Sequence, residues 1–137
     1  MGYLKPELSV KNKYWLPKHR YYELRHYCLQ YPDWKDLYFR TEPRLSVGAH
    51  RWSAQKFPGD PTGKLALLRA ECSRNMELVE RVAKESDGYI YTWLLKAVTE
   101  DVPFSALQTV YGIPCGKDMF YDRYRKFYWL LSQEKGL

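Results

Sequence analysis

Apolar side chains recur three and four residues apart along most of this 137-residue chain, and this spacing constrains the fold more than any other feature. Such a period places apolar side chains on one face of a helix, whereas a half-buried strand needs strict alternation. No stretch rich in Val or Ile alternates with polar residues, and no segment repeats. The chain is therefore predicted to be all-α, a small helical bundle.

The N-terminal segment, residues 1–40, is rich in aromatic and basic side chains. A helix is predicted to begin at Pro17, because proline suits the first position of a helix. Tyr21, Leu24 and Cys28 then fall on one helical face. The segment is predicted to contain helices that bury one aromatic side.

Prolines and glycines punctuate residues 41–61, and no apolar period persists there. This pattern predicts a loop or linker. A helical domain is expected over residues 62–137. Its first helix is expected to begin with Asp60 or Thr62 as the cap and to end at Gly88.

That first helix carries a stripe with alternating spacings of three and four residues. The stripe consists of Leu65, Leu68, Cys72, Asn75, Val79 and Val82. In one interpretation the stripe packs against another helix of the same chain. In the alternative it pairs with a second copy in a homodimer, where a buried Asn75 would set the register.

Residues 102–133 predict a short helix, a glycine-containing turn and a longer helix. Asp101 is expected to cap the short helix, which buries Tyr111, and Gly112 is expected to close it in the left-handed conformation. This order of elements is typical of a helix-turn-helix, although two antiparallel helices of an ordinary bundle share it.

The last helix is predicted to have two faces. The core side is expected to hold Phe120, Tyr124, Phe127 and Leu131. The outward side is expected to include Ser132 and the candidate residues for DNA binding. These candidates are Lys117, Asp118, Tyr121, Asp122, Arg123, Arg125 and Lys126. Cationic side chains hold phosphates, and Tyr or Asp can reach base edges in the major groove.

Two runs of this segment are Tyr111-Gly112-Ile113-Pro114 and Met119-Phe120-Tyr121-Asp122-Arg123-Tyr124-Arg125-Lys126-Phe127. In these runs the chain resembles the C-terminal end of the RinA/ArpU-type phage transcriptional regulators. The opening Asp60-Pro61-Thr62 is similar too, so the resemblance covers about residues 60–133. It implies a helix-turn-helix like region 4 of sigma factors, a Gram-positive prophage origin and a recognition helix over Lys117–Leu131.

Charge and aromatic content point to two classes of partner. The chain has 22 Lys and Arg against 16 Asp and Glu, a formal net charge of +6. The leading hypothesis is a phage-encoded, sequence-specific regulator of transcription that binds double-stranded DNA. The alternative is a protein-binding module that docks on a host complex, RNA polymerase or a defence nuclease, through its aromatic N-terminal half.

Other classes find little support in the residues. No Cys–His or Asp–His arrangement has a motif spacing and no glycine-rich phosphate loop occurs, so the chain is not expected to be an enzyme. Asp118 and Asp122 are expected to belong to a charged helix face rather than to a metal site. We expect no metal, no cofactor and no membrane partner, and a cytoplasmic location.

Overall fold

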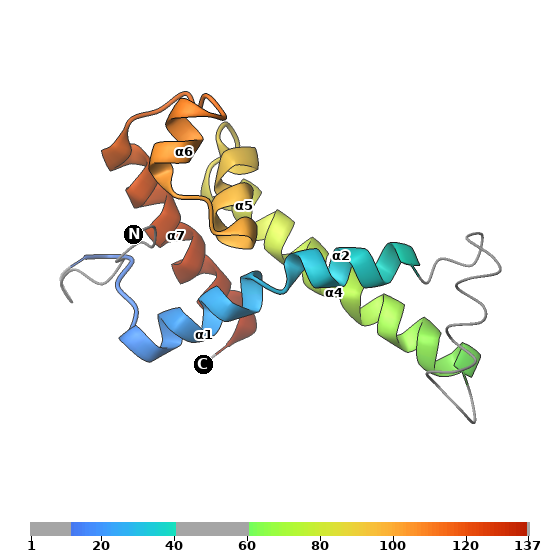
Figure 1. Cartoon of the computed structure of the whole chain (residues 1–137). Coiled ribbons are helices and arrows are strands. Elements are labelled where there is room, and N and C mark those ends of the chain that lie inside the picture. The colour runs from blue at the N-terminus through green and yellow to red at the C-terminus, as the bar shows by residue number, and fades with distance from the viewer. Residues whose placement is uncertain (1–11, 41–60, 137) are drawn as a thin grey trace. The chain divides into compact units, whose positions relative to one another are not determined.

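The computed structural model describes residues 12–40 and 61–136, and within them every regular element is a helix (Figure 1). The helices are α1 (Lys18–Cys28), α2 (Tyr31–Arg40), α4 (Pro61–Ser86), α5 (Tyr91–Glu100), α6 (Phe104–Thr109) and α7 (Lys117–Lys135). The prediction of an all-α fold is confirmed. The predicted cap Asp60 and nearly all of the predicted 41–61 loop lie outside the described residues.

The chain divides into two compact units. Among the described residues, one combines 12–30 with 79–136, and the other combines 31–40 with 61–78. Helix α1 thus groups with the C-terminal helices, whereas the segments predicted from composition follow the order of the sequence. Among the described residues, no helix combines the length and the apolar character needed to cross a membrane.

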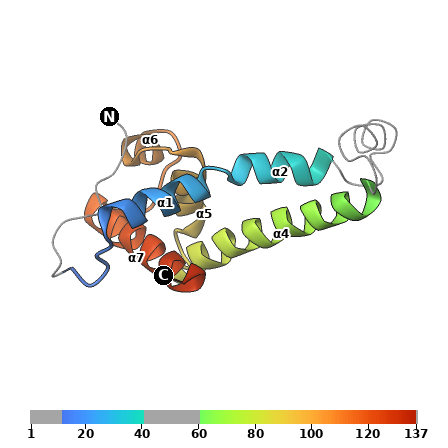
Figure 2. The same ribbon diagram turned by 90° about the horizontal axis from the view of Figure 1, so that it is seen from below.

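In the first unit, α1 packs against α7 and α5 (Figure 2). The backbone carbonyl of Pro17 accepts a hydrogen bond from the Tyr21 N–H at 3.0 Å. The helix begins at Lys18, so Pro17 is its N-cap and not its first residue, one position from the prediction. Its predicted apolar face is buried, with Tyr21, Leu24 and Cys28 at 3%, 0% and 0% exposure. Burial of this face holds α1 to the unit.

Large aromatic rings fill much of this core. Phe104 and Phe120 have ring centroids 5.3 Å apart, and Tyr124 lies 5.9 Å from Phe120 and 5.0 Å from Tyr128. The hydroxyls of Tyr21 and Tyr124 form a buried hydrogen bond of 2.8 Å. Burial raises the pKa of Tyr128 well above its ordinary value, because an ionised phenol is poorly solvated there.

The second unit contains α2 and the part of α4 up to Leu78. Arg69 Nε donates a 3.3 Å hydrogen bond to the backbone carbonyl of Tyr38, and the guanidinium lies 4.1 Å from the centroid of the Tyr38 ring. Trp34 and Cys72 are the buried apolar side chains of this unit within the described residues.

The predicted stripe of α4 is only partly buried. Cys72 is buried in the second unit, and Val79 and Val82 are fully buried in the first. Leu65, Leu68 and Asn75 are half-buried. Three of the six stripe residues are therefore covered within a single copy of the chain.

Asp101 has a role other than the predicted one. It does not cap α6, because Pro103 occupies that position; instead it ends α5 in the left-handed conformation, with φ of 58°. Aspartate tolerates this conformation better than most residues. Its carboxylate accepts a 2.9 Å hydrogen bond from Arg25 Nη2, which ties the end of α5 to α1.

The predicted left-handed glycine is confirmed at Gly112, where φ is +64°, and it supplies a stability test. Gly112→Ala should lower the free energy of unfolding by about 1–2 kcal/mol, because a Cβ strains the left-handed backbone. Nothing lies within 4 Å of a Cβ at this glycine or at the control, Gly88. Gly88→Ala should change the same quantity by less than about 0.5 kcal/mol in urea denaturation. Equal effects would contradict the conformational explanation.

Candidate nucleic-acid interface

The turn between α6 and α7 is closed by backbone hydrogen bonds and one buried side chain. The Tyr111 N–H donates to the carbonyl of Ala106 at 3.2 Å, and the Ile113 N–H donates to that of Leu107 at 2.9 Å. Ile113 is 7% exposed. Helix α7 begins at Lys117, after Pro114-Cys115-Gly116 (Figure 1).

Tyr111 is not buried as predicted; its side chain is 44% exposed. Helix α6 ends at Thr109, so the helical period that placed Tyr111 on the buried face no longer applies. Its backbone carbonyl accepts a 2.8 Å hydrogen bond from Trp93 Nε1. Lys96 Nζ lies 4.7 Å from the Tyr111 ring centroid.

The core side of α7 is confirmed, since Phe120, Tyr124, Phe127 and Leu131 are all buried. Ser132 was predicted to face outward, and that prediction is wrong. Its side chain is fully buried, and its hydroxyl accepts a 3.1 Å hydrogen bond from Arg20 Nε. Helix α1 covers this part of α7, which sequence spacing within α7 alone does not reveal.

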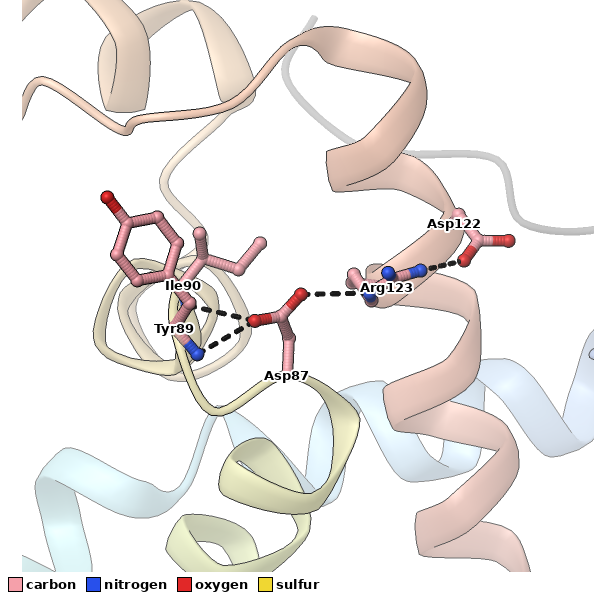
Figure 3. Close-up of polar contacts among 5 residues, drawn as sticks. All are labelled: Asp87, Tyr89, Ile90, Asp122 and Arg123. Carbon is pink, nitrogen blue, oxygen red and sulfur yellow. Dashed lines mark hydrogen bonds and ion pairs between the residues drawn. The ribbon is translucent and has the colours of Figure 1, made fainter.

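Arg123 lies between two carboxylates (Figure 3). Its Nε donates to Asp87 Oδ2 at 2.9 Å, and its Nη1 donates to Asp122 Oδ2. The other oxygen of Asp87, Oδ1, accepts the backbone N–H groups of Tyr89 at 2.8 Å and Ile90 at 3.2 Å. One carboxylate thus joins the start of α5 to the middle of α7.

The pKa directions agree with this geometry. Burial by itself raises the pKa of the Asp87 carboxyl, but the hydrogen bonds from the Tyr89 N–H, from Arg123 and from the Ile90 N–H lower it more. The net effect is a pKa below the ordinary value. The hydrogen bond to Asp87 is the main cause that raises the pKa of Arg123. Two of the predicted DNA-binding residues, Asp122 and Arg123, are therefore engaged within the unit.

The other cations of the candidate set have no carboxylate partner among the described residues. Lys117 is exposed at the first position of α7, and Arg125 and Lys126 are half-exposed. The Nε of Arg125 is buried without a hydrogen-bond partner in this part of the chain. No carboxylate of the described residues neutralises these three positive charges.

The two remaining candidates differ in their surroundings. Tyr121 is half-buried, with its ring centroid 6.3 Å from that of Phe104 and 5.9 Å from Lys117 Nζ, and burial raises its pKa. Asp118 is exposed in the first turn of α7, where its charge interacts favourably with the helix dipole. Both lie on the first turns of the helix, near Lys117.

Sequence reasoning missed Asp87. The run Ser86-Asp87-Gly88 was interpreted only as a helix end, although an Asp followed by Gly also indicates a side chain that accepts backbone N–H groups two and three residues later. Its contact with Arg123 spans 36 positions in the sequence, so no local pattern could reveal it.

No three His, Cys, Asp or Glu side chains gather into a metal-binding cluster within the described parts of the chain. Comparison with family models, curated proteins and solved structures finds no match for this chain. The candidate interface therefore rests on the geometry of α6, the turn and α7.

We expect Asp87→Ala to lower the free energy of unfolding by about 1–3 kcal/mol, because two N–H groups and Arg123 lose their acceptor. The control Asp118→Ala removes an exposed carboxylate and should cost less than about 1 kcal/mol. Because folding lowers the pKa of Asp87, the charged carboxylate adds to the free energy of unfolding at neutral pH. This contribution is lost as the pH falls below about 4. Urea denaturation from pH 7 to 3 should show the gap between wild type and Asp87→Ala narrowing with acid. A gap independent of pH would argue against the charged form of Asp87 as its source.

Proposed function

We propose that this chain is a helix-turn-helix regulator of transcription that binds double-stranded DNA in a sequence-specific manner. In this proposal α6 braces the DNA backbone and α7 is the recognition helix. The observation that carries the proposal is a set of three cations on α7, the helix that follows the closed turn. Lys117, Arg125 and Lys126 have no carboxylate partner in the part of the chain that the structure describes.

The order of elements supports the same function. A short helix, a closed turn and a longer helix follow one another in the order that a helix-turn-helix requires. The core side of α7 is occupied by aromatic rings, so its position on α5 and α1 is held firmly. A recognition helix needs such support, because base contacts depend on a fixed orientation.

Within the predicted set, the residues divide by role. Arg123 and Asp122 are positioning residues in this proposal, since Arg123 forms ion pairs with both Asp122 and Asp87. Lys117, Arg125 and Lys126 contact phosphate or base edges. Asp118 and Tyr121 lie beside Lys117 at the helix start, where a carboxylate can accept from cytosine N4.

Binding to duplex DNA should fall with salt, because each phosphate contact releases counterions. We expect fluorescence anisotropy with a labelled duplex from the neighbouring promoter region to show a linear loss of affinity on a log–log salt plot. Lys117→Ala with Lys126→Ala should reduce the slope by about two, one for each lost phosphate contact.

The matched control is Lys18→Ala, an exposed lysine of α1 without a carboxylate partner among the described residues. It should leave the slope unchanged. Absence of salt-dependent binding to any duplex, or an equal loss in the control, would count against the proposal.

One observation favours the alternative of a protein-binding module, though on a different surface from the aromatic N-terminal half. Tyr89, Val110 and Tyr111 are 70%, 68% and 44% exposed, and the Trp93–Tyr111 hydrogen bond joins α5 to the segment after α6. In the N-terminal half, Tyr21 is buried against α7 and is unavailable to a partner. Binding to purified bacterial RNA polymerase that is lost in Tyr89→Ser with Val110→Ser, in a chain that does not bind DNA, would favour this alternative.

A further inference from the structure

A second stripe runs along the outer side of α4, separate from the buried one. It consists of Leu67, Glu71, Arg74 and Leu78, with spacings of four, three and four residues. At about 100° per residue, this stripe lies on nearly the opposite side of the helix from Arg69, which contacts α2. Leu67 is 72% exposed, Glu71 and Arg74 are exposed, and Leu78 is half-buried.

The two charged residues of this stripe make no polar contact with the described part of the chain. Neither Glu71 nor Arg74 has an ion pair or hydrogen bond to another described side chain. The stripe stops at Leu78, because the next residue at this spacing, Arg81, already forms ion pairs with Glu85 and Glu134. The unused surface is therefore three turns of one helix.

The order apolar, acidic, basic, apolar is complementary to itself when the helix direction is reversed. We infer that a second copy of this chain binds here, with the two α4 helices antiparallel about a twofold axis between Cys72 and Ser73. Leu67 then packs on the partner's Leu78, and Glu71 pairs with the partner's Arg74. Each contact occurs twice, as a twofold interface requires.

The same ordering argues against a parallel arrangement of the two copies. A parallel second helix would place Glu71 beside an identical carboxylate and Arg74 beside an identical guanidinium, which costs binding energy. Only the antiparallel pairing matches both the apolar and the charged positions. Three turns of paired helix bury less than the roughly 1,200 Å² of a typical stable interface, so the dimer is weak, with a dissociation constant of order 10–100 µM.

The inference does not rest on DNA binding and is tested without DNA, by sedimentation equilibrium of the full chain over about 1–300 µM. Glu71→Arg and Arg74→Glu should each raise the dissociation constant at least about tenfold, because both create like-charged pairs across the axis. The two variants change the net charge in opposite directions. If both raise the dissociation constant, a change in the overall charge repulsion between two copies cannot be the cause. The double variant Glu71→Arg with Arg74→Glu restores opposite charges across the axis and should return to within about threefold of wild type.

The control is Glu77→Arg, an exposed residue of α4 outside the stripe, which should dimerise as wild type does. Circular dichroism of every variant should show unchanged helix content, because these side chains are exposed and have no ion pair with the described residues. A wild type that is monomeric over the whole range overturns the inference. Single reversals that dimerise normally, or a double variant that does not recover, overturn it equally.

Discussion

The first unit depends on the burial of the aromatic side of α7. Phe120, Tyr124 and Tyr128 stand one turn apart along that helix, and rings from two other elements contact them: Phe104 of α6 and Tyr21 of α1. Apolar burial is the dominant favourable term in folding, and rings of this size bury the most area per side chain. Because α1 and α6 both contact this column, it decides which side of α7 stays outside.

Once that side is chosen, polar contacts sort the remaining charges of α7. Arg123 is oriented toward the start of α5 and is paired with Asp87 and Asp122, whereas Lys117 and Lys126 are not paired within the described residues. The Asp87 side chain is only 10% exposed, and a carboxylate so poorly solvated stays charged only when it has such partners. The same helix therefore contains cations that stabilise the unit and cations that can serve a ligand, and the DNA-binding proposal concerns the latter.

Helix α4 shows a similar division between its two sides. The stripe that the sequence made prominent is partly buried within the chain, as Cys72, Val79 and Val82 show. The stripe proposed for the second copy is less apolar and was not recognised in the sequence, because exposed Glu71 and Arg74 look like an ordinary solvated face. Only their exposure, their lack of partners and the end of the stripe at Arg81 distinguish it.

The sequence by itself determined the helical class, the start of α1 beside Pro17, the left-handed Gly112 and the inward side of α7, because each of these follows from local backbone preference or from the helical period. It did not determine that Ser132 is buried, that Tyr111 is exposed or that Asp101 binds Arg25. Nor did it show that Arg123 is engaged by Asp87. The exposure of Tyr111 follows from the end of α6 at Thr109, which the spacing of apolar residues did not place. The other outcomes depend on which distant segment packs against each residue, and contacts across 36 or more positions leave no trace in local spacing.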